Sequence, residues 1–176
     1  MASKSERKSV AGKTVADFPE LVAQWHPTKN GEVTPDQVAA GSSKKVWWKC
    51  PEGPDHEWHA VTSSRTRGNK CPACRGSQVS VTNSLVSLFP EIAAQWHPTK
   101  NGALRVDQVV AGSGKRVWWK CPKGPDHEWQ TTPAERTHQR GETGCPACSG
   151  RKVSCTNSLA ARFPKIALQW HPQKKN

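Results

Sequence analysis

Two groups of cysteine and histidine residues offer metal-binding chemistry, and they occur in the same order at two places in the chain. Each group has a Cys-x₅-His element followed by a Cys-x-x-Cys pair, and the eight residues are Cys50, His56, Cys71, Cys74, Cys121, His127, Cys145 and Cys148. Three thiolates and one imidazole form a soft set of the kind that closes around structural Zn²⁺ in tetrahedral geometry. We therefore predict two structural zinc ions. Four protein ligands leave no open position for a catalytic water, so we expect no enzymatic activity.

A Cys-x-x-Cys pair by itself is also typical of thioredoxin-type redox sites. That interpretation requires a βαβ context, which the sequence around Cys71 and Cys145 does not show. Each pair also has two further ligand-type residues nearby, which favours zinc. The seventh cysteine, Cys155, stands where the first copy has Val81, so we expect it to occupy a hydrophobic position.

The composition fits small modules that need a metal ion or a disulfide to be stable. The chain has 176 residues, and only 34% of them are hydrophobic. Modules of this kind bury too little apolar surface to be stable without a metal or a disulfide. The polar, basic start at residues 1–8 is unlike a secretory signal, and no apolar run is long enough for a membrane span. We expect a cytoplasmic or nucleic-acid-associated intracellular protein, not a secreted one, whose thiols stay reduced and bind metal.

An internal repeat organises the chain. The block Phe18–Pro27 recurs as Phe89–Pro98 and again as Phe163–Pro172. The second copy carries three extra residues between His127 and Cys145, which predicts a loop at about 137–144. The predicted organisation is a disordered basic arm (1–12), a first repeat (13–80), a second repeat (81–154) and a truncated third repeat (155–176) that caps the second module.

Each repeat predicts a short helical part followed by a hairpin. Proline at the first helical position starts a helix in each Phe-Pro block, and a second proline ends it. Asn or Ser at 82–84 and 156–158 can cap a short turn that lies just before the Phe-Pro block. Thr34 can cap a short helix at 34–38, whose second copy lacks both the Thr and the Pro. Residues 45–50 and 57–61 are rich in β-formers and form a hairpin whose turn brings Cys50 to His56.

The aromatic residues have two expected roles. Trp47 and Trp48 must face opposite sides of a strand, so one packs inward and its neighbour faces outward. His26, His97 and His171 each follow a Trp. Because His171 has no Cys partners, we expect a structural role for all three rather than metal ligation.

The formal net charge is +12, and two Cys₃His zinc sites lower it to about +10, because each adds one dication and three thiolates. Such an excess attracts polyanions, of which nucleic acid is the commonest in a cytosol. An exposed Trp beside these cations can stack on bases. The predicted phosphate contacts are Lys44, Lys45, Lys49, Arg65, Arg67, Lys70, Lys115, Arg116, Lys120, Arg136 and Arg140. The alternative is a structural subunit of a larger assembly, whose Trp faces are protein contacts. We expect no small-molecule substrate.

With these residues in view, the chain resembles the zinc-ribbon domain family of treble-clef type. The shared pattern is Trp-His-Pro, then Val-Trp-Trp-Lys-Cys-Pro, His-Glu-Trp and Cys-Pro-x-Cys, at Trp25–Cys74 and Trp96–Cys148. The resemblance implies a fold of small zinc-stabilised α+β repeats, in which two zinc-ribbon or treble-clef-like hairpin modules alternate with short helical units. It also implies that the eight Cys and His residues above are the ligands. Members of this family are nucleic-acid-associated proteins, some joined to a nuclease-like domain, and this chain has no length left for one.

Overall fold

The computed structural model describes residues 10–138 and 144–170 and divides the chain into two compact units, Met1–Asn83 and Ser84–Asn176. The boundary falls three residues after the predicted one, because residues 80–83 hydrogen-bond to the first metal centre. Several predictions lie outside the described residues: most of the basic arm and of the 137–144 loop, together with Arg140 and His171.

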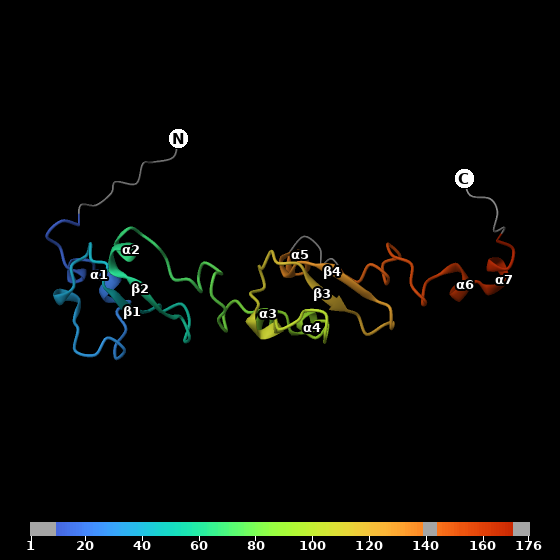
Figure 1. Ribbon diagram of the computed structural model, residues 1–176, viewed down its shortest axis with the longest axis horizontal. Coiled ribbons are helices and arrows are strands. Elements are labelled where there is room, and N and C mark those ends of the chain that lie inside the picture. Colours follow the sequence, from blue (N-terminus) through green and yellow to red (C-terminus); the bar gives the residue numbers. More distant parts are fainter. Residues whose placement is uncertain (1–9, 139–143, 171–176) are drawn as a thin grey trace, which may run out of the picture. The chain divides into compact units, whose positions relative to one another are not determined.

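A two-stranded antiparallel hairpin forms the centre of each unit (Figure 1). In the first unit β1 (Lys45–Lys49) pairs with β2 (Glu57–Val61), and in the second β3 (Val117–Lys120) pairs with β4 (Glu128–Thr131). Trp48 lies opposite Trp58 in the register and is fully buried, whereas Trp47 is half-buried on the other face. The predicted hairpin and the opposite orientation of the two Trp side chains are confirmed.

The helical part of each unit packs along the outer edge of the hairpin. In the first unit it comprises η1 (Val15–Asp17) and α1 (Pro19–Val22), and the chain then runs beside β1. The Lys49 N–H donates to the Gln24 carbonyl at 2.8 Å, and the His26 N–H donates to the Trp47 carbonyl at 3.1 Å. These bonds satisfy backbone groups that an edge strand would otherwise expose.

The second unit repeats this arrangement with α3 (Leu85–Leu88) and α4 (Pro90–Ala93). Ser84 caps α3 as predicted, because its hydroxyl accepts from the Ser87 N–H at 3.1 Å. The short turns η2 (Pro35–Gln37) and η3 (Val106–Gln108) both form. Gln37 and Gln108, the last residues of the two turns, accept hydrogen bonds from the backbone N–H groups of Thr34 and Arg105. This cap does not use the side chain of the first residue, so η3 needs neither Thr nor Pro.

Two short helices that the sequence analysis did not predict follow the hairpins, α2 (Thr62–Thr66) and α5 (Pro133–Thr137). In α5, Thr132 accepts from the Glu135 N–H and Glu135 accepts from the Thr132 N–H, a capping box at the end of β4. Each helix carries one buried arginine, Arg65 or Arg136, back against the hairpin.

In the described part of the third repeat, residues 155–170, the helices do not cap the second module as predicted. These helices, α6 (Leu159–Arg162) and α7 (Pro164–Ala167), contact each other, and neither contains a buried residue. Ser154, directly before this repeat, is buried and contacts His127 of the second metal centre.

The core of each unit is small. In the first it gathers Val15, Phe18 and Leu21 from the helical part against Trp48 and Trp58 of the hairpin. Among the described residues, no helix is long and apolar enough to cross a membrane. Because so few aliphatic side chains are buried, the apolar core contributes little stability, and we expect a bound metal to supply much of it.

Candidate metal centres

The hairpin turn and the Cys-x-x-Cys turn bring the predicted ligands together in each unit. In each Cys₃His group, which consists of Cys50, His56, Cys71 and Cys74 or of Cys121, His127, Cys145 and Cys148, the four donor atoms all lie within 4.8 Å of one another. In each group three residues are buried, and the last cysteine is at the surface. The two sets of four ligands predicted from the sequence therefore form two separate centres.

The spacing of the donor atoms fits a tetrahedral zinc ion. Zn–S bonds of about 2.3 Å at tetrahedral angles place two sulfurs roughly 3.8 Å apart. Cys50 Sγ lies 3.7 Å from Cys74 Sγ, and Cys121 Sγ lies 3.7 Å from Cys148 Sγ. A disulfide would need about 2.05 Å. The residues therefore fit two structural Zn²⁺ ions and not a disulfide.

The imidazole faces each centre through Nδ1. His56 Nδ1 lies 3.5 Å from Cys74 Sγ, and His127 Nδ1 lies 3.4 Å from Cys148 Sγ. Hydroxyl groups hold the other ring nitrogen: Ser80 Oγ at 3.1 Å and Thr82 Oγ1 at 2.7 Å from His56 Nε2. With Nδ1 free to bind metal as a lone pair, Nε2–H donates to these hydroxyls and fixes the tautomer.

Sequence reasoning missed these orienting hydroxyls. Ser154 Oγ and Thr156 Oγ1 stand at 3.2 and 2.7 Å from His127 Nε2 in the second unit. Asn157 also ties this segment to the Cys-x-x-Cys turn through the Ala147 carbonyl at 2.7 Å. The sequence signal is the repeated Ser-x-Thr-Asn-Ser run at 80–84 and 154–158, of which the capping prediction uses only residues 82–84 and 156–158.

One glycine in each hairpin turn is required by the imidazole. A Cβ at Gly53 would lie 2.6 Å from the His56 ring, and one at Gly124 would lie 2.5 Å from the His127 ring. Such approaches are well inside van der Waals contact, so any larger residue would push the imidazole away from the centre.

The thiols favour a cation. Partial desolvation and the neighbouring thiols of Cys50 and Cys71 raise the pKa of the surface thiol of Cys74 to about 12, and the same causes, with Cys121 and Cys145, raise the pKa of Cys148 to about 11. Without a cation, these sulfurs would hold their protons at neutral pH. A zinc ion supplies the positive charge that makes the thiolate form favourable.

Comparison with known protein families agrees with this geometry. Residues 21–77 and 92–151 each match a family described as a probable treble-clef zinc-finger domain. The chain belongs to this family. No curated protein matches it. The two treble-clef zinc-finger matches together cover both hairpins and all eight ligands, so the predicted zinc-stabilised α+β fold is confirmed.

The treble-clef units place two predicted phosphate contacts in their interior. Arg65 is 7% exposed and Arg136 is 3% exposed. The Arg65 guanidinium lies 5.3 Å from the Trp48 ring and 5.1 Å from the Trp58 ring, where cation–π attraction is effective. The prediction that Arg65 and Arg136 contact phosphate is therefore corrected. Both belong to the core, because α2 and α5 turn them inward.

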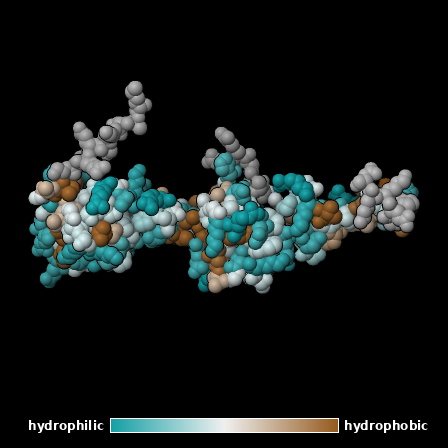
Figure 2. Space-filling model, turned by 45° about the horizontal axis from the view of Figure 1, so that its top comes forward, coloured by the Kyte–Doolittle hydropathy of each residue, from teal (hydrophilic) through white to brown (hydrophobic). Residues whose placement is uncertain are grey.

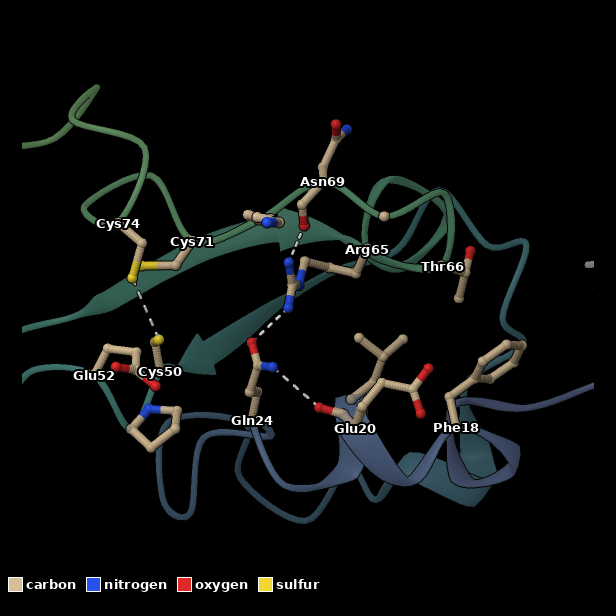
Figure 3. A pocket seen from close by; sticks show the side chains of 14 residues that line it. Phe18, Glu20, Gln24, Cys50, Glu52, Arg65, Thr66, Asn69, Cys71 and Cys74 are labelled. Atoms are coloured by element: carbon tan, nitrogen blue, oxygen red, sulfur yellow. Dashed lines mark hydrogen bonds between the residues drawn. The ribbon is translucent and has the colours of Figure 1, made fainter. Parts of the chain in front are cut away.

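Arg65 also joins the helical part to the hairpin (Figure 3). It donates to the Gln24 side-chain oxygen and to the Asn69 carbonyl, beside a cavity of about 440 Å³ that reaches Cys50 and Cys74. In the second unit Arg136 donates to Gln95 Oε1 at 3.1 Å. Gln24, directly before Trp25, and Gln95, directly before Trp96, thus each link the helical part to the arginine that packs on the hairpin.

The other predicted cations divide into two groups. Lys44, Lys45, Arg67, Lys70, Lys115 and Arg116 are exposed. Lys49 and Lys120 are half-buried and pair with Glu57 and Glu128 at 3.3 and 3.7 Å. Arg140 lies outside the described residues.

His26 and His97, the two described His residues that follow a Trp, have hydrogen bonds of the structural kind predicted for them. His26 Nδ1 accepts from the Lys29 N–H at 3.1 Å, and its Nε2 faces Glu57 Oε1 at 3.2 Å. His97 makes the same contacts with Lys100 and Glu128. Both imidazoles are buried and lie apart from the metal centres.

The position of Cys155 is not hydrophobic, contrary to expectation. The side chain is exposed, and its Sγ lies 3.1 Å from Asp126 Oδ1, while Val81 at the equivalent position is 55% exposed. Cys155 therefore belongs to neither the core nor a metal centre.

The ion pairs of Glu57 predict a stabilising effect that does not change between pH 8 and 5. The Lys29 ammonium lowers the pKa of Glu57 to about 2, and Lys49 and His26 act in the same direction. A depressed carboxyl pKa stabilises the folded state above the unfolded value of about 4.3, and this stabilisation is lost as the pH falls towards 2. We expect Glu57→Gln to lower the melting temperature of the zinc-loaded protein by the same amount at every pH from 8 to 5.

Thermal melts across that range provide the measurement. The matched control is Glu32→Gln, an exposed carboxylate on a turn, which should leave the melting temperature unchanged. A Glu57→Gln protein that melted at the same temperature as the unchanged protein from pH 8 to 5 would contradict this prediction.

Proposed function

We propose that this zinc-binding protein is not an enzyme and that it binds nucleic acid through the outer faces of its hairpins, inside a reducing compartment. The supporting observation is a half-buried Trp under a lysine in each unit. Lys29 Nζ lies 4.7 Å from the Trp47 ring centroid, and Lys100 Nζ lies 4.7 Å from that of Trp118. Aromatic rings beside cations are the elements of sequence-tolerant binding to single strands.

Strand alternation defines these outer faces. In the first hairpin the outer face consists of Lys45, Trp47 and Lys49 and their cross-strand partners Val61, His59 and Glu57. In the second it includes Trp118 and Lys120 with their partners Gln130 and Glu128, and Arg116 directly precedes β3. The His59 ring stacks on Trp47 with centroids 5.2 Å apart, an arrangement that a base could extend or replace. At the matching place the second hairpin has Gln130, so we expect base stacking to be stronger on Trp118.

A hollow of about 450 Å³ adjoins the first outer face. It is lined by Trp25, Pro27, Pro51 and Pro54, with Lys49 at its side. An apolar, aromatic floor next to an ammonium group suits a base and its phosphate. The face of the molecule drawn in Figure 2 is mainly hydrophilic, with small hydrophobic patches.

The charge supports a polyanionic partner. A formal net charge of +12 and a pI of about 9.7 favour binding to phosphates, and affinity of this origin falls steeply with salt. Backbone contacts of this type position a nucleic acid without reading its sequence, so we expect broad sequence tolerance.

Binding of fluorescent oligonucleotides across a salt series tests the proposal. Removing one phosphate contact lowers the salt slope by about 0.9 for duplex DNA and about 0.7 for single strands. We expect Lys45→Gln and Arg116→Gln each to lower it by that amount. We expect Trp118→Ala to weaken single-strand binding by about tenfold, because base stacking contributes about 1–3 kcal/mol per base.

Two controls accompany these variants. Trp118→Phe keeps an aromatic face and should retain most of the affinity, and Lys165→Gln removes a charge on α7, which belongs to neither hairpin. Affinity that is weak and insensitive to salt would contradict the proposal.

The second candidate function is protein interaction within a larger assembly. The observation in its favour is a group of exposed apolar residues on α6, α7 and the residues that follow, including Phe163, Ile166 and Trp170. Such residues are typical of contact surfaces.

A further inference from the structure

The third copy of the helical part, Ser158–Trp170, exposes apolar residues that its two counterparts bury. We call this segment the third helical unit. Leu159, Phe163 and Ile166 are 39%, 54% and 53% exposed. The matching residues in the first unit, Val15, Phe18 and Leu21, are 0%, 5% and 4% exposed. The same sequence pattern is therefore covered in the first unit and uncovered here.

The third helical unit already has the conformation of its covered counterpart. Phe163 has φ −137° and ψ 61°, against −140° and 65° for Phe89, and Leu168 has −66° and −22°, against −62° and −18° for Ala94. Ser158 caps α6 through the Ala161 N–H at 3.2 Å, as Ser84 caps α3. A segment that is preorganised in this way loses little conformational freedom on docking.

The repeats show what covers such a segment. In the first unit the cover is the edge of a zinc hairpin, whose first strand donates from the Lys49 N–H to the Gln24 carbonyl. The Trp25 ring meets Trp48 edge to face with centroids 5.6 Å apart. The Gln24 side-chain oxygen accepts from Arg65 (Figure 3).

The third helical unit keeps the residues that make these contacts. Gln169 and Trp170 stand at the positions of Gln24 and Trp25, and Trp170 is 73% exposed. An exposed Trp at this position can pack edge to face against a Trp of a partner, and the glutamine before it can accept a hydrogen bond from an Arg of that partner.

We propose that the third helical unit is a docking element for a zinc hairpin other than β1–β2 and β3–β4. These two hairpins are already covered by their own helical parts, through the Trp25–Trp48 and Trp96–Trp119 bridges. The partner is therefore a zinc hairpin of the same kind whose own helical part is absent or displaced. It presents a free first-strand edge, a buried Trp at the place of Trp48 and an arginine at the place of Arg65.

Sedimentation and fluorescence anisotropy with the intact chain test this proposal. The probe is the same chain without residues 1–26, so that its first hairpin is uncovered. It also carries Phe163→Ala and Trp170→Ala, so that it cannot dock on itself. We expect a one-to-one complex between the zinc-loaded probe and the intact chain.

Three comparisons decide the outcome. Placing Phe163→Ala and Trp170→Ala in the intact chain should weaken the complex at least tenfold. An otherwise identical probe that retains residues 1–26 should also bind at least tenfold more weakly, because its hairpin is covered. No complex, or a complex that is indifferent to these changes, overturns the proposal.

The zinc content of the probe shows whether its first hairpin has formed, since an intact probe carries two ions. Should it carry one, the decisive variant is an extended chain in which a second copy of residues 99–157 follows residue 172. We expect this chain to bind a third zinc ion at least tenfold more tightly than the same chain with Phe163→Ala and Trp170→Ala. Equal zinc affinity in the two extended chains overturns the proposal.

Discussion

We expect Cys71→Ser to remove one of the two zinc ions and to unfold the first unit while the second stays folded. Cys71 is a buried donor of the first centre, and its loss leaves three ligands. Structural zinc sites contribute an apparent 10–16 kcal/mol to folding, whereas a whole domain is stable by only about 5–15 kcal/mol. A unit with so small an apolar core cannot compensate for that loss.

Native mass spectrometry and amide hydrogen exchange measure this result. The ion count should fall from two to one, and protection should disappear from residues 10–83 and remain in the second hairpin. Cys155→Ser is the matched control, because Cys155 is an exposed cysteine outside both centres, and it should keep both ions. A Cys71→Ser protein that retains two ions, or protection in the first hairpin, would show that the first centre is wrongly assigned.

We expect Arg65→Ala to destabilise the zinc-loaded first unit by about 3 kcal/mol. The substitution removes a desolvated cation–π contact, worth about 2 kcal/mol, and a charged hydrogen bond to Gln24, worth about 1.5–3 kcal/mol, and these terms overlap. It also leaves a space beneath Trp48. Denaturant unfolding followed by Trp fluorescence gives the free energy of unfolding directly.

Arg67→Ala is the control, because Arg67 lies two residues away and is exposed. Its effect on the free energy of unfolding should stay within about 0.5 kcal/mol. If Arg65→Ala left stability unchanged and weakened nucleic-acid binding instead, Arg65 would be a phosphate contact after all.

The parts of the fold that could be predicted depend on repetition and on strong local chemistry. The Cys-x₅-His and Cys-x-x-Cys elements occur twice in one order, so chance could not explain them, and Trp47 and Trp48 must face opposite ways on any strand. Proline at the start of α1 and α4 and serine at the start of α3 act locally, through backbone geometry and capping.

The parts that could not be predicted depend on contacts between distant segments. Arg65 is an ordinary surface residue by type, and only α2 and the Trp48–Trp58 pair place it inside. The choice of Nδ1 in His56 follows from Ser80 and Thr82, which lie 24 and 26 residues away. Burial of a repeated segment likewise depends on whether a hairpin lies against it, which no local pattern records.

Thermal denaturation before and after complete zinc removal by a chelator tests the central claim most directly. The account predicts two ions per chain, a cooperative transition while both are bound, and no cooperative transition in the stripped chain until zinc is restored. A stripped chain that melted as sharply and at the same temperature as the loaded one would contradict it.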